Sequence, residues 1–153
     1  DAVLDPRIMG ATPTHDEMRK LIEAELADAE GLEVVLDRAR VIGREQMFLI
    51  GIRLLTGLIE PEHAGPAYAL VAETLIEKLH AAVEADFETR HGRVPGGKSA
   101  VVAMGRLGSC EMTATSDLDL IIVATDTPEY ISPSTALSLP VISTRPFSRS
   151  TAE

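Results

Sequence analysis

The 153-residue sequence is poor in the features that mark secreted, membrane-bound and nucleic-acid-binding proteins. Its single cysteine, Cys110, excludes an internal disulfide and suits a reducing cytosol. No apolar run approaches the ~18 residues of a membrane span, and no signal segment opens the chain. Lys and Arg number 14 against 24 Asp and Glu, and the net charge of −10 argues against binding to phosphate backbones or anionic lipids. We therefore expect a cytoplasmic protein with neither a nucleic-acid nor a membrane partner.

Aromatic side chains are also scarce, at 3% with no Trp, so the core must be built from aliphatic residues and Met. That composition favours helix packing. The apolar fraction of 45% is ordinary for a globular protein, and the length fits one domain, or a small domain with part of another. Because the chain begins at Asp1 rather than Met, we expect it to be a piece of a longer protein.

Helical periodicity dominates the first part of the chain. Thr14 and Glu17 fit a capping box, which predicts the start of a first helix, and Gly31 is expected to end that helix. A third helix is expected to begin within residues 61–66, where two prolines suit a first turn, and to run to about His91. Together with a second helix between these two, described next, they make three amphipathic helices in succession, which imply a helical bundle.

A second helix is predicted between these two, over about residues 32–56. Gly43 and Gly51 weaken it by up to ~1 kcal/mol each relative to Ala, unless a closely packed neighbour uses the space. We assign residues 1–92 to a helical region, in which residues 1–13 form an irregular lead-in. None of the four histidines is paired with Cys or an acid at metal-ligand spacing, so we interpret all of them as structural or surface residues: His15, His63, His80 and His91.

Two apolar strands follow, predicted over residues 99–104 and 117–123, with a turn and room for one short helix between them. Both strands are near-continuous apolar runs, which indicates a position at the centre of a sheet rather than at its edge. We group residues 93–126 as the start of a second, strand-containing unit.

Two aspartates one residue apart, Asp117 and Asp119, open the second predicted strand. Strand residues i and i+2 point to the same side, so both carboxylates are expected to project together. Such a pair repels itself unless a hard cation such as Mg²⁺ lies between them, commonly bridging to substrate phosphates. The alternative is a strand that begins with two solvated acids. Their place after a glycine turn, between apolar flanks, favours a metal-dependent nucleotidyl-transfer site with both aspartates as catalytic metal ligands.

The turn before these aspartates supplies candidate nucleotide-binding residues. Gly105 and Gly108 lack a Cβ, so their backbone N–H groups can approach phosphates closely. Ser109 adds a hydroxyl donor, and Arg106 can neutralise phosphate charge. Ser116 is expected to cap the turn and to orient the first aspartate. For Arg106 and Ser109, a role as ordinary turn residues is the alternative.

The composition changes again after residue 126. Residues 127–153 hold four Pro, six Ser and four Thr without sustained periodicity, and we interpret them as a disordered, low-complexity tail. Two origins of this tail are possible at this point: it is a natural linker, or it is an artefact of the reading frame or of cloning.

Residues 105–111, Gly-Arg-Leu-Gly-Ser-Cys-Glu, and 116–120, Ser-Asp-Leu-Asp-Leu, resemble a known pattern. The glutamine synthetase adenylyltransferase family, within the polymerase-β-like nucleotidyltransferase superfamily, typically reads Gly-Lys-Leu-Gly-Gly-x-Glu and then Ser-Asp-(Leu/Ile)-Asp-Leu. The segment 91–97 and the helices before it are also similar, so the resemblance spans roughly residues 1–124. It implies an α+β fold, in which an N-terminal helical bundle precedes the start of a polymerase-β-like nucleotidyltransferase domain with two strands present.

The resemblance also implies a large bifunctional enzyme. One half transfers AMP from ATP to a tyrosine of glutamine synthetase in a Mg²⁺-dependent reaction, and the other half removes the AMP by phosphorolysis. PII signalling proteins regulate the balance between the two. The form Glu-Met-Thr-Ala-Thr-Ser-Asp-Leu-Asp at 111–119 is more similar to the C-terminal, adenylylating half, while the deadenylylating half stays open.

The sequence departs from the family pattern in ways that bear on activity. Arg106 stands where Lys is usual and Ser109 where Gly is common, and the superfamily's Gly-Gly/Ser pair can match residues 105–106 or 108–109. The family's third metal-binding Asp, in a segment resembling Asp-x-Arg-Leu-Arg-Pro, has no counterpart here. We therefore expect this chain alone to be inactive or nearly so. The competing interpretation is a non-catalytic helical interaction module that keeps only ATP or partner binding.

Overall fold

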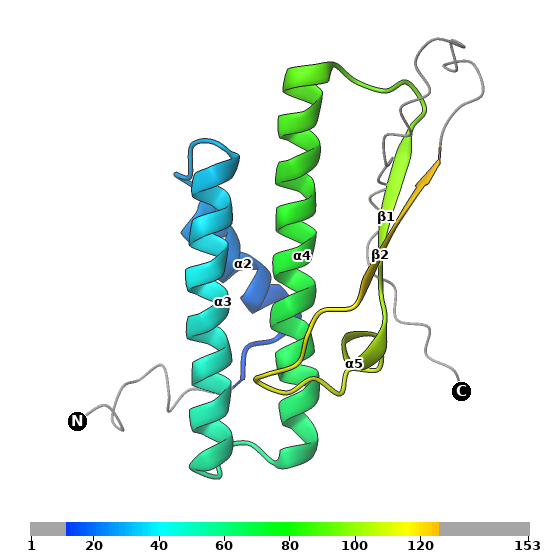
Figure 1. Ribbon diagram of the computed structural model, residues 1–153. Helices are drawn as coiled ribbons and strands as arrows, with labels where there is room; N and C mark the ends of the chain where they lie inside the picture. Colours follow the sequence, from blue (N-terminus) through cyan, green and yellow to red (C-terminus); the bar gives the residue numbers. More distant parts are fainter. Residues whose placement is uncertain (1–11, 126–153) are drawn as a thin grey trace.

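The computed structural model describes residues 12–125, which form two long helices, two shorter helices and a small antiparallel sheet (Figure 1). The elements in chain order are α2 (His15–Leu26), α3 (Leu32–Leu55), α4 (Pro61–His91), β1 (Lys98–Ala103), α5 (Gly105–Gly108) and β2 (Leu120–Thr125). The tail predicted over 127–153, and all but the end of the lead-in predicted over 1–13, lie outside the described residues. Among those residues, none of the helices is both long and apolar enough to cross a membrane.

The first helix begins as predicted and ends earlier. The Thr14 N–H donates to Glu17 Oε2 at 2.8 Å and the Glu17 N–H donates to Thr14 Oγ1 at 3.4 Å, which confirms the capping box. Gly31, expected to end this helix, instead precedes the first residue of α3, with φ at +87°. The chain reverses direction between α2 and α3, and glycine accommodates the left-handed backbone that the reversal requires.

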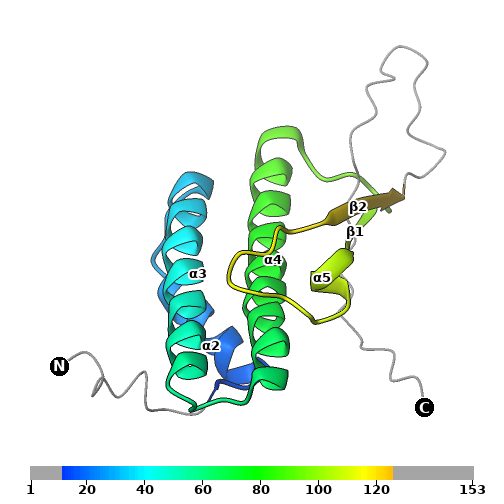
Figure 2. The same cartoon turned by 60° about the horizontal axis from the view of Figure 1, so that its bottom comes forward.

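The long helices α3 and α4 lie side by side, with the sheet and α5 on the far side of α4 from α3 (Figures 1 and 2). The two glycines of α3 lie against α4. A Cβ on Gly43 would meet Leu75 Cδ1 at 3.1 Å, and a Cβ on Gly51 would meet the Tyr68 hydroxyl at 3.3 Å. Close packing therefore uses the space that both glycines leave, which is the condition under which the sequence could tolerate them in a helix.

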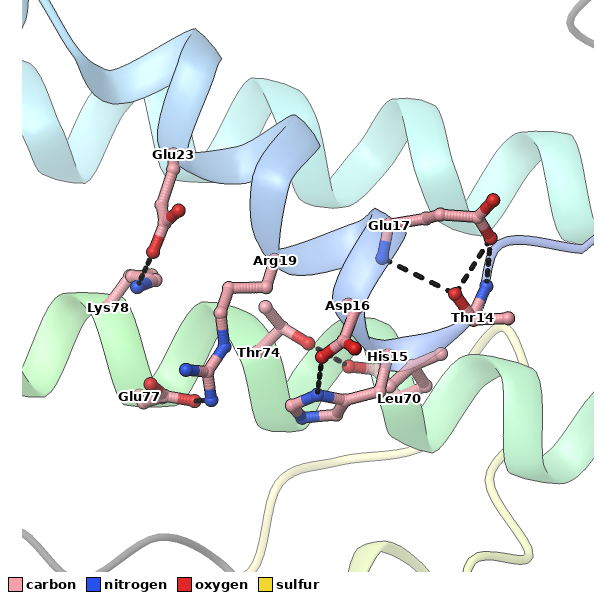
Figure 3. A network of polar contacts seen from close by, with 10 residues as sticks. All are labelled: Thr14, His15, Asp16, Glu17, Arg19, Glu23, Leu70, Thr74, Glu77 and Lys78. Atoms are coloured by element: carbon pink, nitrogen blue, oxygen red, sulfur yellow. Dashed lines mark hydrogen bonds and ion pairs between the residues drawn. The ribbon is translucent and has the colours of Figure 1, made fainter.

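The short helix α2 crosses the other two, with Met18 and Ile22 almost fully buried beneath it. Two ion pairs join it to α4 (Figure 3): Arg19 Nη2 lies 3.0 Å from Glu77 Oε2, and Lys78 Nζ lies 2.5 Å from Glu23 Oε1. Exposed pairs of this kind contribute roughly 0.2–1 kcal/mol each. The buried apolar face of α2 therefore contributes more to its attachment than the ion pairs do.

The two strands pair in an antiparallel register that runs from Lys98 opposite Thr125 to Ala103 opposite Leu120. β1 matches the predicted strand to within one residue, whereas β2 begins three residues later than predicted, at Leu120. Within residues 12–125 each strand has only the other as a neighbour, so the predicted position at the centre of a sheet is wrong for this part of the chain. In the first part of β2 the large apolar side chains are accordingly exposed: Leu120, Ile121, Ile122 and Val123.

Candidate nucleotide-binding site

The glycine turn and the two aspartates meet at one end of the sheet, where β1 ends and β2 begins. The antiparallel pairing continues one residue past the strands, because the Met104 N–H donates to the Asp119 carbonyl oxygen at 2.9 Å. This bond places Asp119 next to Gly105, the first residue of α5. Two segments that lie fourteen positions apart in sequence are thus held together by backbone pairing.

Gly105 is the residue on which this arrangement depends. Its φ is +53°, in the left-handed region, and a Cβ built on it would overlap Asp119 Oδ2 and lie 3.4 Å from Asp119 Cγ. The carboxylate therefore lies directly over the glycine backbone, where any side chain would displace it. Only glycine satisfies both the backbone conformation and this close approach.

The rest of the turn packs tightly onto the end of β1. A Cβ on Gly108 would lie 2.7 Å from the Ala103 carbonyl oxygen, so this glycine is also required by a close approach. The Gly108 N–H donates to the Met104 carbonyl at 3.0 Å, and Leu107 is almost fully buried. The α5 turn is therefore anchored by its backbone and by one apolar side chain.

The polar side chains predicted on this turn point toward solvent. Arg106 and Ser109 are both exposed. The Ser109 hydroxyl donates weakly to the Arg106 carbonyl at 3.4 Å and to Glu111 Oε2 at 3.3 Å. Arg106 is thus accessible to an anion, while the Ser109 hydroxyl has partners within the turn.

Ser116 caps the turn that precedes the aspartates. Its Oγ accepts the Thr113 N–H at 2.9 Å, and its own N–H donates to the Thr113 carbonyl at 3.2 Å. These two bonds fix the backbone immediately before Asp117, as the sequence predicted for the capping role. The further role of orienting Asp117 stays a prediction.

Asp117 and Asp119 are exposed and lie just ahead of β2 rather than inside it. The alternation of strand side chains therefore does not by itself bring their carboxylates together. Among residues 12–125, no group of three His, Cys, Asp or Glu side chains is placed to hold a metal ion. Two carboxylates still fit Mg²⁺ chemically, because this ion prefers oxygen ligands and is commonly held by one or two carboxylates with water and substrate phosphates.

Sequence reasoning missed the support beneath this site. Gly65 in α4 lies against the chain that leaves α5: a Cβ there would be 2.9 Å from the Cys110 carbonyl oxygen and 3.3 Å from Glu111 Cα. At this point Cys110 adopts a φ of +57°. One feature of the sequence could have indicated this contact: Gly65 lies early in a long helix. A glycine there lowers helix stability by up to ~1 kcal/mol relative to Ala, unless another segment packs into the space that it leaves.

A half-buried polar cluster fixes the other end of the sheet to α4. Ser99 in β1 is fully buried, its hydroxyl donates to Glu84 Oε1 at 3.0 Å, and His80 Nε2 lies 3.2 Å from Ser99 Oγ. Burial lowers the pKa of His80, and the Glu84 carboxylate opposes this effect. The neutral imidazole is therefore favoured, and the structural role predicted for His80 is confirmed.

A hollow of about 850 Å³ lies at the start of α2 and α4. None of the site residues predicted from the sequence lines it. Its walls include Thr12, His15, Leu58, Glu60, His63 and Glu73.

Comparison with known proteins identifies the family. Residues 1–138 match the sequence model of the family described as glutamate-ammonia ligase adenylyltransferase. Proteins named bifunctional glutamine synthetase adenylyltransferase/adenylyl-removing enzyme are 46% identical over 123 residues in Bradyrhizobium sp. BTAi1 and in Rhodopseudomonas palustris TIE-1, and 47% identical in Brucella suis biovar 1.

Each of these alignments covers 80% of this chain and 12% of the relative, so the chain spans about one eighth of the length of the relatives it matches. No solved structure matches the chain. With a family match over most of its length and relatives of this identity, the chain belongs to the glutamate-ammonia ligase adenylyltransferase family.

Proposed function

We propose that the chain carries part of a nucleotidyl-transfer site that acts on glutamine synthetase, transferring AMP from ATP to a tyrosine or removing it by phosphorolysis. The observation that carries this proposal is the Asp119 carboxylate lying over the backbone of Gly105. A metal-binding carboxylate held against a glycine turn brings a cation and a phosphate chain to the same place. The names of the relatives support glutamine synthetase as the substrate protein.

In this proposal each residue has a defined part. Asp117 and Asp119 hold Mg²⁺, and the glycine turn at 105–108 receives the ATP phosphates with Arg106 beside them. When bound, Mg²⁺ supplies neutralisation of the phosphate charge and polarises the phosphoryl oxygens. The attacking tyrosine hydroxyl of glutamine synthetase forms the new bond to the α-phosphorus while pyrophosphate leaves.

The surrounding fold and the regulation belong to the same proposal. The sheet formed by β1 and β2 is the beginning of a polymerase-β-like nucleotidyltransferase domain, in the adenylylating half of a cytoplasmic enzyme under the control of PII proteins. We propose that the 153-residue chain alone is inactive or nearly so. The support for this is the third metal-binding Asp of the family pattern, which has no counterpart in the sequence; within residues 12–125 no third His, Cys, Asp or Glu is placed to join two others at a metal ion.

Nucleotide binding tests the site directly. We expect Mg²⁺-dependent binding of ATP to the chain, measured by calorimetry, and at least a tenfold loss of affinity in the Asp117→Asn/Asp119→Asn variant. The matched control is Asp16→Asn/Asp37→Asn, which removes the same charge from exposed positions on α2 and α3. Equal binding by both variants would contradict the proposal.

Such a result would favour the second candidate, a helical interaction module without a metal site. The absence of a three-ligand group within residues 12–125 is the observation in its favour. An adenylylation assay with radiolabelled ATP and glutamine synthetase separates activity from binding. Turnover near that of a full-length relative would contradict the expected inactivity of the chain.

A further inference from the structure

The glycine turn of α5 ends in a Schellman motif, which glycine usually closes. The Glu111 N–H donates to the Arg106 carbonyl at 2.9 Å, and the bond inside it joins the Cys110 N–H to the Leu107 carbonyl at 3.1 Å. This motif needs a left-handed backbone at its closing residue, which here is Cys110 with φ at +57°. Within residues 12–125, no other residue with a side chain has a positive φ. Because a Cβ makes that conformation unfavourable, contacts outside the turn have to hold Cys110 in it.

Helix α4 supplies contacts of this kind, and α5 lies beside it (Figure 2). A Cβ on Gly65 of α4 would lie 2.9 Å from the Cys110 carbonyl oxygen and 3.3 Å from Glu111 Cα, so the backbone of α4 packs directly on the backbone that closes the turn. The Cys110 side chain is half-buried against the main apolar core. Leu107 before it and Met112 after it are almost fully buried in the same core. The closing residue is therefore held both through its backbone and through its side chain.

We propose that Gly65 is a positioning residue for the nucleotide site and that it acts through Cys110. This inference rests on the proposed function, which assigns the glycine turn at 105–108 to the ATP phosphates. The carbonyl groups that accept the two closing bonds belong to Arg106 and Leu107 of this turn, so a shift of Cys110 moves the turn itself. The helical region is thus part of the nucleotide site, because α4 sets the place of the turn.

The two halves of the proposed site have separate supports. The Asp119 side is placed by the backbone bond from Met104 and by the close approach to Gly105. The C-terminal end of the turn is placed by the contact between Gly65 and Cys110. A change at Gly65 should therefore disturb the end of the turn while the pairing of Met104 with Asp119 remains.

Amide hydrogen exchange, measured by NMR on the whole chain, tests the positioning step without a nucleotide. Gly65→Ala should speed exchange at the Cys110 and Glu111 amides about tenfold more than at the Met104 amide, because the opening is local. Ile22→Val, which removes one methyl group from the core beneath α2, controls for a general loss of stability and should affect the three amides alike. Equal acceleration of the three amides in Gly65→Ala would overturn the proposal.

Calorimetry of ATP binding in the presence of Mg²⁺ tests the consequence for the site. Gly65→Ala should weaken binding about tenfold, because small displacements of a positioned group are costly. Adding Cys110→Gly should restore most of the affinity, since glycine adopts a positive φ freely and lets the carbonyl turn away from the new Cβ. A merely structural defect would not be repaired by removing a packed side chain. The Ile22→Val control should bind ATP as the unsubstituted chain does.

The outcomes separate this inference from the proposed function. Loss of affinity in Asp117→Asn/Asp119→Asn with none in Gly65→Ala contradicts the positioning role and leaves the proposed function standing. Loss in Gly65→Ala that Cys110→Gly does not repair overturns the action through Cys110. If the unsubstituted chain binds no ATP, the proposed function fails, and hydrogen exchange still decides whether Gly65 positions the turn.

Discussion

At the scale of single residues, the site depends on what glycine lacks. Gly105 and Gly108 were predicted as phosphate-binding residues because a backbone without Cβ can approach a ligand. The structure adds a second reason, since the space over Gly105 is occupied by the Asp119 carboxylate and the space over Gly108 by the Ala103 carbonyl. Gly105 therefore both positions the Asp119 carboxylate and shapes the turn, and its substitution should affect both.

Gly105→Ala should weaken Mg²⁺-dependent ATP binding at least tenfold, because a Cβ displaces the Asp119 carboxylate. The control is Gly57→Ala, since Gly57 also has a positive φ, at +70°, but has open space around its Cβ position. The left-handed backbone costs a non-glycine residue roughly 1–2 kcal/mol in either case. Urea denaturation should therefore show that both variants lose stability, while calorimetry shows that only Gly105→Ala loses affinity. Unimpaired binding by Gly105→Ala would contradict the role given to this contact.

At the scale of the elements, local signals were read correctly where a few neighbouring residues decide the outcome. The Thr14–Glu17 capping box and the start of α4 at Pro61 are satisfied within a single turn of chain. The predictions failed where contacts between segments distant in sequence determine where an element begins or ends. Gly31 belongs to the reversal between two helices, and the start of β2 depends on how far β1 extends opposite it.

The contacts that bring the site together were beyond sequence reasoning for the same reason. Nothing near Gly65 in the sequence indicates that Cys110 and Glu111 lie against it, because this approach depends on the path of the whole sheet. The apolar pattern of the strands similarly suggested a sheet centre, although the described sheet has two strands only. The residue types in the sequence were thus enough to propose where the candidate site lies, whereas the geometry of the site could be described only once the fold was known.

Gly65→Ala should destabilise the chain by about 1–3 kcal/mol, because its Cβ would press on the backbone of Cys110 and Glu111, which cannot rotate away. Gly43→Ala is the control: its Cβ would meet only the flexible end of Leu75, and a gain of helix propensity of up to ~1 kcal/mol offsets the contact. The free energy of unfolding in urea measures both. Equal effects of the two substitutions would show that the α4 contact with the site is not tightly packed.

At the scale of the whole molecule, α4 is the element to which everything else is attached. α3 and α2 pack on it. The strand-containing part is fixed to it at two separated points: Gly65 lies against the segment that leaves α5, and His80 and Glu84 hold Ser99 of β1. The aspartates therefore have a defined position relative to the bundle only while both attachments hold. One of these attachments includes His80, whose pKa is lowered by burial, so the attachment of the sheet should depend on pH.

Acidification should weaken the attachment of the sheet through His80. Burial lowers the pKa of His80 below its usual 6.5, so the unfolded chain binds a proton more readily than the folded one. The stability contributed by the neutral imidazole is present above pH 6.5 and is lost as the pH falls from there through the lowered pKa. Glu17, Glu23 and Asp28, whose pKa values are lowered by hydrogen bonds from Thr14, Lys78 and Arg38 respectively, lose their contributions only below about pH 4.5.

Urea midpoints measured between pH 7.5 and 5.0 should therefore fall for the unsubstituted chain and change much less for His80→Gln. The His80→Gln variant should also be less stable at pH 7.5, because glutamine cannot reproduce the imidazole's packing beside Ser99. His63→Gln, an exposed control on the first turn of α4, should keep the pH dependence of the unsubstituted chain. If His80→Gln retains that dependence, a different group titrates, and the sheet is held to α4 independently of pH in this range.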